Sequence, residues 1–180
     1  MRKIIVSSQV SMDSVVDSPE KFVFDYVNDE FLAYATKQLF ESDTLIMGRL
    51  TYEGFAEAWP ARAGADEFAD RMNNLPKYVA SRTLKGELAW NANLIEGDVA
   101  KEVAKLKEQK GMNILQYGSG ELTRTLLQHG LIDEFRLMVF PVAVGTGLRV
   151  FENIQKVPMK LLETKSFSTG VVILHYQPVK

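Results

Sequence analysis

The stretch TLIMGRLTYEGF, residues 44–55, joins an apolar run to an amphipathic segment. Leu45–Met47 are apolar without interruption, which predicts a buried strand. Thr51–Ala58 carries apolar residues at helical spacing, which predicts a short helix. Gly48 and Arg49 form the turn between the two. A strand that passes directly into a helix is the repeating unit of an α/β sheet.

The same alternation continues through the first two-thirds of the chain, and the last third is strands only. Because strands separated by helices pair in parallel, the pattern predicts a mostly parallel α/β sheet that ends in an antiparallel hairpin around Thr169-Gly170. The predicted strands are 3–10, 44–47, 77–81, 93–96, 113–117, 134–144, 160–168 and 171–177, and the predicted helices are 28–41, 51–58, 65–73, 98–110 and 118–128.

Length and composition predict one globular domain over residues 1–180. The chain has 46% hydrophobic residues, a formal net charge of -2 and no cysteine. A balance without a basic excess argues against a broad nucleic-acid surface. The lack of cysteine excludes disulfides and thiolate metal sites and fits a cytoplasmic protein. The apolar run Ile4–Val6 is too short for a signal peptide or a membrane span, so we expect no membrane partner.

Two strand-to-helix turns contain glycine. They are Gly48-Arg49-Leu50-Thr51 and Gly118-Ser119-Gly120-Glu121-Leu122. In open α/β sheets ligands bind beyond the carboxyl ends of the strands, where helix N-termini present free N–H groups. Glycine lets the backbone approach a phosphate, and Arg49 offers a planar donor fork. The alternative interpretation is that the glycines only make tight turns and that Arg49 is a solvated surface residue.

A third candidate segment follows the strand predicted at 77–81. Ser81, Arg82 and Thr83 place two hydroxyls and a guanidinium at the end of that strand. Such a set could bind a further phosphate, for example the 2′-phosphate that distinguishes NADP from NAD. An ordinary loop is the alternative.

Few residues in the sequence could transfer a proton. His129, at a helix end, is expected to cap carbonyl groups, and His175, in the last strand, is expected to be structural. Two such histidines and no cysteine argue against a histidine triad or a metal site. Asp13 and Asp29 are the carboxylates that we select as catalytic candidates, with helix capping or solvation as the alternative. A chain with few proton-transfer groups suits hydride transfer, because the cofactor then carries the difficult step.

Four segments together resemble the dihydrofolate reductase-like superfamily, and more closely its branch that includes the reductase domain of bacterial riboflavin biosynthesis. The segments are TLIMGRLTYEGF, PKYVASRTL, ILQYGSGEL and LIDEFRLMVFPVAVGTGLRVF. The opening VSMDS resembles that branch's S-[LM]-D-G loop, with Ser14 in place of the glycine. The most specific segment is D-E-x-x-L-x-x-x-P-x-x-x-G-x-G, from Asp133 to Gly147. The resemblance covers essentially the whole chain.

The resemblance implies a three-layer dihydrofolate reductase-like fold and an NADPH-dependent reductase that acts on a small heterocycle. Residues at the three candidate segments would bind NADPH: Gly48, Arg49 and Thr51; Ser81, Arg82 and Thr83; and Gly118, Ser119, Gly120, Glu121 and Leu122. The substrate would lie between the loop 13–18, the first helix and the Gly118 turn. The riboflavin branch often dimerises, which suggests a homodimer with the strand 134–144 as its contact, and a monomer stays open as the alternative.

The substrate side departs from the family pattern. Dihydrofolate reductases carry Pro-Trp before the first helix, whereas Glu20 follows Pro19 here. The riboflavin branch carries an asparagine in the first strand, where this chain has Ser7, and a D-x-P-x-L-x-x-R stretch, where this chain has AWPARAGADEF. Two other functions therefore stay open. One is an NADP-binding sensor or scaffold without turnover, and the other is an interaction module that uses the region of Trp59-Pro60.

Overall fold

The structure, a computed structural model, describes residues 1–179. All eight strands form one sheet in the order β4-β3-β2-β5-β1-β6-β8-β7. The strands are β1 Ile4–Ser11, β2 Ser42–Gly48, β3 Lys77–Ala80, β4 Ala92–Ile95, β5 Asn113–Tyr117, β6 Glu134–Phe140, β7 Met159–Ser166 and β8 Val172–Pro178. The pairs from β4 to β6 are parallel, whereas β8 runs antiparallel to both β6 and β7. The predicted mostly parallel sheet with a C-terminal antiparallel hairpin is confirmed.

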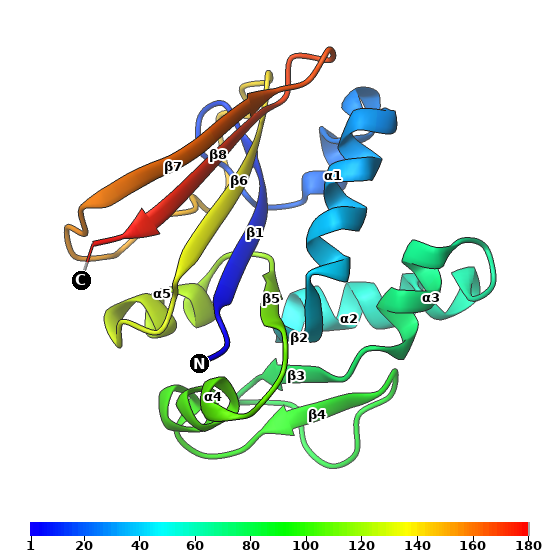
Figure 1. Ribbon diagram of the computed structural model, residues 1–180, viewed down its shortest axis with the longest axis vertical. Helices are drawn as coiled ribbons and strands as arrows, with labels where there is room; N and C mark the ends of the chain where they lie inside the picture. Colours follow the sequence, from blue (N-terminus) through cyan, green and yellow to red (C-terminus); the bar gives the residue numbers. More distant parts are fainter. Residues whose placement is uncertain (180) are drawn as a thin grey trace.

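Helices cover both faces of the sheet, so the molecule has three layers (Figure 1). One face packs against helices on the right of the view, and the other against helices at the lower left. The first group is α1 Asp29–Phe40, α2 Arg49–Ala58 and α3 Glu67–Asn74, and the second is α4 Val99–Glu108 and α5 Glu121–Gln128. Short 3-10 helices at Pro19–Lys21, Phe24–Tyr26 and Pro60–Arg62 were not predicted.

Alternation along the strands explains why two apolar cores form. In β1, Ile4 and Val6 belong to the core on the α4–α5 side, while Ile5 belongs to the core under α1–α3. Both sides of the strand are buried, as expected for a central parallel strand. A third cluster, around Phe140, lies where α1 covers β6 and β8.

The prediction that the strand beginning at Glu134 continues to Val144 is wrong, because β6 ends at Phe140. Pro141 follows and has no N–H to donate to a neighbouring strand. The chain then turns, and the N–H groups of Val144 and Gly145 donate to the carboxylate of Asp13 instead of to a strand. A contact between distant segments thus ends the strand.

Within residues 1–179, no helix combines the length and the apolar character needed to cross a membrane.

Candidate functional site

The carboxyl ends of β2, β3, β4 and β5 open into one cavity of about 900 Å³. The three segments selected from the sequence all reach it, although they lie far apart along the chain. Every residue predicted to bind the cofactor lines the cavity: Gly48, Arg49, Thr51, Ser81, Arg82, Thr83, Gly118, Ser119, Gly120, Glu121 and Leu122. This is the edge of the sheet at which open α/β proteins bind their ligands.

The first wall of the cavity is the start of α2, which begins at Arg49 and not at Thr51 as predicted. Gly48 is the residue before the helix, and no side chain caps the first turn. The N–H groups of that turn therefore remain available to a ligand. A Cβ at Gly48 would meet nothing within 4 Å, so the backbone is open to the cavity. Arg49 donates to Glu53 Oε2 at 2.9 Å, one turn along the helix.

The second wall is the turn from β5 into α5. Gly118 has φ 77°, a left-handed conformation that favours glycine. Gly120 precedes α5 and has no side chain that could accept from the N–H groups of the first turn, while its own N–H donates to Thr123 Oγ1 at 3.4 Å. Ser119 Oγ lies 2.5 Å from Ser8 Oγ, which ties the turn to the central strand β1. The two uncapped helix starts give the cavity a partial positive character at two points.

Two residues that the sequence patterns did not single out lie beneath this turn. Gln116, a buried residue of β5, donates through Nε2 to the carbonyl of Gly118 at 3.1 Å and to Thr123 Oγ1 at 2.5 Å. Ser8 is likewise buried in β1. A polar residue inside an otherwise apolar strand is the sequence signal that could have identified both, because a buried polar group needs a hydrogen-bond partner. Here the partners are Gly118 and Ser119 of the turn and Thr123 of α5, whereas Gln116 Oε1 has no partner among residues 1–179.

The third wall is the loop after β3. Ser81 Oγ accepts hydrogen bonds from the N–H groups of Thr83 at 3.1 Å and Leu84 at 3.0 Å, so this hydroxyl shapes the loop. Arg82 extends across the cavity, and its Nη2 lies 2.5 Å from Glu121 Oε1. The loop therefore presents a guanidinium, while the Ser81 hydroxyl serves mainly the turn.

The two catalytic candidates do not line the cavity. Asp13 accepts hydrogen bonds from Ser11 Oγ at 2.7 Å and from the N–H groups of Val144 at 3.0 Å and Gly145 at 2.7 Å. These hydrogen bonds, that from Ser11 foremost, hold the pKa of Asp13 well below its usual range. The contacts give Asp13 a structural part in joining two loops. Asp29 is exposed at the first position of α1. A catalytic part for either residue stays a prediction.

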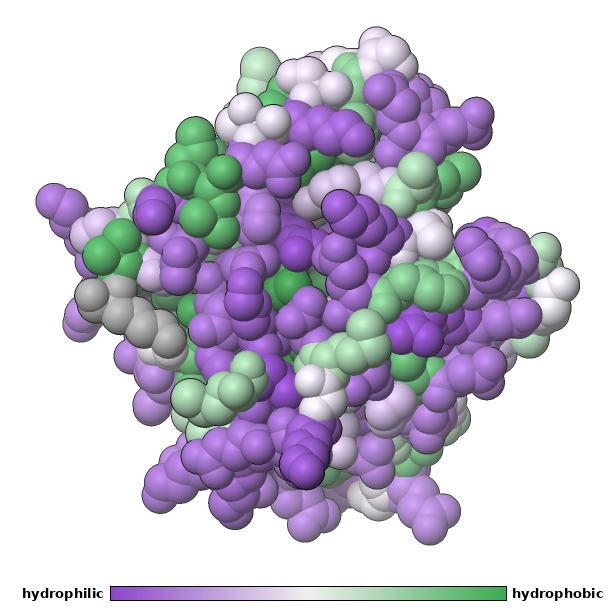
Figure 2. Space-filling view, in the orientation of Figure 1, coloured by the Kyte–Doolittle hydropathy of each residue, from purple (hydrophilic) through white to green (hydrophobic). Residues whose placement is uncertain are grey.

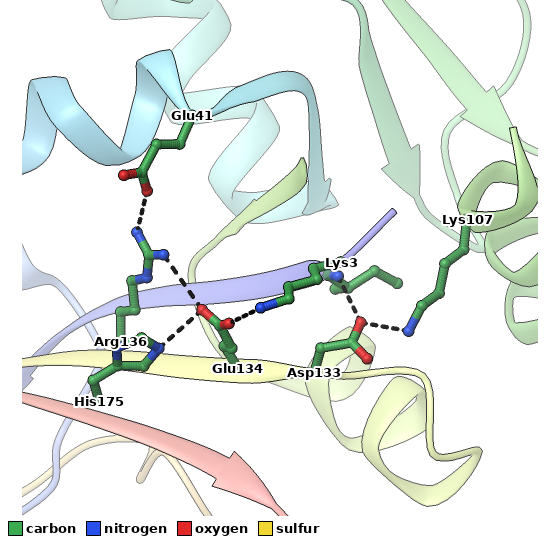
Figure 3. Close-up of polar contacts among 8 residues, drawn as sticks. Lys3, Glu41, Lys107, Asp133, Glu134, Arg136 and His175 are labelled. Carbon is green, nitrogen blue, oxygen red and sulfur yellow. Dashed lines mark hydrogen bonds and ion pairs between the residues drawn. The ribbon is translucent and has the colours of Figure 1, made fainter. Parts of the chain in front are cut away.

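Both histidines lie where the sequence predicted them. His129 Nδ1 is 2.9 Å from the carbonyl oxygen of Thr125 at the end of α5, which is a capping contact. His175 belongs to a network of charges on the sheet face that α1 covers, away from the cavity (Figure 3). In that network Glu134 accepts from Lys3 at 2.7 Å, from Arg136 at 3.3 Å and from His175 at 2.9 Å.

In the region of Trp59-Pro60, Pro60 is exposed, whereas the tryptophan ring is packed against its neighbours. Trp59 is half-buried, and its ring packs against Phe55 and Phe68 with centroid distances of 6.2 and 5.5 Å. The guanidinium of Arg62 covers the ring at 4.7 Å. This tryptophan is accounted for by packing on α2 and α3.

Comparisons with known proteins show which family the chain resembles. The model of the RibD C-terminal domain family matches residues 2–173. The uncharacterized protein YyaP of Bacillus subtilis (strain 168) is 32% identical over 179 residues, which cover 97% of this chain and 94% of YyaP.

Two solved structures share the fold. One, from Shewanella sp. PV-4, is described as a riboflavin biosynthesis protein; it has a TM-score of 0.74, 20% identity and 99% coverage of both chains. The other is the diaminohydroxyphosphoribosylaminopyrimidine deaminase/5-amino-6-(5-phosphoribosylamino)uracil reductase of Thermotoga maritima. It has a TM-score of 0.70 and 15% identity, and the match covers 99% of this chain and 57% of that chain.

Proposed function

The chain belongs to the RibD C-terminal domain family, a branch of the dihydrofolate reductase-like fold, and we propose that it is an NADPH-dependent reductase that transfers a hydride to a small heterocyclic substrate. The observation that carries the proposal is the convergence of the three predicted phosphate-binding segments on one cavity at the carboxyl edge of the sheet. A substrate related to 5-amino-6-(5-phosphoribosylamino)uracil or to dihydrofolate is part of the proposal. So is a cytoplasmic location, which fits the absence of cysteine.

The residues present fit a dinucleotide phosphate. Two helix starts without a side-chain cap, at Gly48 and Gly120, face the cavity and would hold the pyrophosphate through backbone N–H groups. Arg49 would add a charged donor beside the first of them. Arg82, on the loop after β3, would hold the 2′-phosphate. NADPH, when bound, supplies the hydride, and the chain's part is to orient both reactants and to exclude water.

The test is calorimetric titration of the protein with NADPH and then with NADH in one buffer, followed by assays of NADPH oxidation with candidate heterocycles. We expect tight NADPH binding, much weaker NADH binding, and oxidation that depends on substrate. Equal binding of the two dinucleotides would contradict the 2′-phosphate assignment. Binding of neither would contradict the proposal as a whole.

A second function is tested by the same experiment. The chain could bind NADP as a sensor or scaffold without turnover, and the position of Asp13 and Asp29 outside the cavity favours it. Under that proposal NADPH binds tightly but is not oxidised with any of the substrates of the reductase class.

A further inference from the structure

An ion pair crosses the cavity between the loop after β3 and the start of α5. Arg82 Nη2 lies 2.5 Å from Glu121 Oε1, and both residues line the cavity. β3 and β5 are the two neighbours of β2 in the sheet. The pair therefore spans the end of β2, where Gly48 and Arg49 lie. Both side chains are largely exposed, which places the pair on the solvent side of the cavity.

We propose that Glu121 competes with the cofactor for Arg82. In the ligand-free chain Glu121 pairs with Arg82, and Glu121 must release Arg82 when a dinucleotide phosphate binds. The inference rests on the function proposed above. A dinucleotide that lies along the strand ends, from the Gly118 turn to the loop at Ser81, has to pass the Arg82–Glu121 pair. Glu121 thereby lowers cofactor affinity, although it belongs to a segment expected to bind the cofactor.

The chemistry of the exchange favours phosphate. A carboxylate offers one negative charge and two oxygens, whereas a phosphate monoester carries about 1.5 to 2 charges and three acceptor oxygens. The guanidinium of Arg82 fits either partner through the same planar fork. The phosphate therefore displaces the carboxylate, and the carboxylate returns to Arg82 when the phosphate leaves.

The charge of Glu121 has a second effect. Glu121 is the first residue of α5, at the helix start that would face the pyrophosphate. A carboxylate at this position repels an anion that binds at the same helix start. Glu121 thus lowers cofactor affinity in two ways, by competing for Arg82 and by repelling the phosphates directly. The experiment has to separate these two effects.

The other arginine of the cavity shows a different arrangement. Arg49 also has a carboxylate partner, Glu53, at 2.9 Å. That pair lies four residues apart on one helix, so it can persist while a ligand sits at the helix start. Among the ion pairs of residues 1–179, the Arg82–Glu121 pair is the one that joins two walls of the cavity.

The experiment is a double-mutant cycle of NADPH affinity with wild type, Glu121→Gln, Arg82→Gln and the double variant. Because exposed ion pairs are weak, we expect Glu121→Gln to tighten NADPH binding by about two- to fivefold. The same substitution should give a smaller gain when Arg82 is already glutamine. Stopped-flow release of NADP⁺ should slow in Glu121→Gln, because the competing carboxylate is gone.

Glu57→Gln is the matched control, since it removes the same charge from an exposed position near the far end of α2 and should leave affinity unchanged. Weaker NADPH binding in Glu121→Gln would overturn the inference, because Glu121 would then hold the ligand. If Glu121→Gln tightens NADPH binding equally with arginine and with glutamine at position 82, the inference is overturned. The charge of Glu121 would then repel the ligand directly, without Arg82. Unchanged affinity in Glu121→Gln, with normal wild-type binding, would refute this inference alone, whereas a wild type that binds no NADPH would refute the proposed function.

Discussion

Gly118 and Thr51 meet where the two glycine turns of the cavity touch: a Cβ atom added to Gly118 would lie 2.5 Å from Thr51 Oγ1. Gly118 also has φ 77°, which a residue with a Cβ adopts at a cost. The start of α2 and the turn after β5 are thus packed with no room for another atom. Glycine is required here by backbone conformation and by close approach.

Gly118→Ala should lower the free energy of unfolding by about 1–2 kcal/mol through the left-handed conformation, and the contact with Thr51 adds to that cost. Because the turn has to move, NADPH binding should weaken as well. Urea denaturation and calorimetric titration measure the two effects.

Gly54→Ala is the matched control. Gly54 lies inside α2, and a Cβ added there would meet nothing within 4 Å, so this change should stabilise by about 0.5–1 kcal/mol. Equal stabilities of the two variants would contradict the argument.

Arg49→Ala should weaken NADPH binding by about 1.5–3 kcal/mol, the scale of a hydrogen bond to a charged group. The proposed contact is between the guanidinium and a phosphate at the start of α2. Calorimetric titration of the variant measures the loss. Lys156→Ala, which removes an exposed positive charge outside the cavity, should bind as wild type does. If Arg49→Ala retains full affinity, Arg49 does not belong to the site.

Glu134→Gln should destabilise the fold by about 3 kcal/mol, the lower end of the cost of breaking a buried ion pair. Glu134 lies among Lys3, Arg136 and His175, and its side chain is 8% exposed. Without its charge, the half-buried Arg136 keeps Glu41 as its carboxylate partner, at 3.0 Å. Chemical denaturation at neutral pH measures the change. Glu163→Gln on the exposed strand β7 should have little effect, and a comparable loss there would contradict the assignment.

The same carboxylate predicts a pH dependence. Burial by itself raises the pKa of Glu134, but hydrogen bonds from Lys3 and His175 and the charges of His175 and Arg136 outweigh burial and hold the pKa below the ordinary 4.5. A lowered folded-state pKa means that the stabilisation is complete above about pH 4.5 and is lost as pH falls through the lowered value. Stability measured from about pH 6 down to about pH 3 should therefore fall less steeply in Glu134→Gln than in wild type. If the curves of stability against pH are parallel for the two proteins, other carboxylates govern the loss of stability in acid.

The expected homodimer stays a prediction, and the structure changes where its contact can lie. β6 is paired on both sides, by β1 and β8, so its backbone has no free edge. β7 is an edge strand with exposed Leu161 and Leu162, and Figure 2 shows apolar residues over this side of the molecule. Leu161→Glu should shift a β7-mediated dimer to monomer in sedimentation velocity, since a buried unpaired charge is costly. A dimer of unchanged stability would exclude β7 as the contact.

The order of the elements could be predicted from the sequence because each strand and helix carries its own periodicity and its own glycine or cap. Asn28, for instance, caps α1 by accepting from the N–H of Phe31 at 3.0 Å. The end of β6 was only partly predictable: Pro141 marks it in the sequence, but Asp13, which binds the amides beyond it, is distant in the sequence.

The cavity was partly predictable for the same reason. Its glycines and arginines mark the turns, and the carboxyl ends of parallel strands bring those turns together. The supporting pair Ser8–Ser119 and the bridging pair Arg82–Glu121 depend on which strands are neighbours. Local sequence patterns do not show which side chains will pair across neighbouring strands. The substrate site could not be predicted because no sequence motif marks it.

The position of β1 in the sheet also determines when this strand can pair during synthesis of the chain. β1 precedes the other strands of this sheet in the chain, yet its two partners are β5 and β6, at residues 113–117 and 134–140. Until residue 117 has been made, the buried segment IIVSSQVS has two unpaired edges, and the edge that pairs with β6 stays unpaired until residue 140. Long-range pairing of this kind is slow and leaves aggregation-prone surface uncovered. While residues 12–116 are being made, β1 therefore has no partner strand in this sheet to cover its edges.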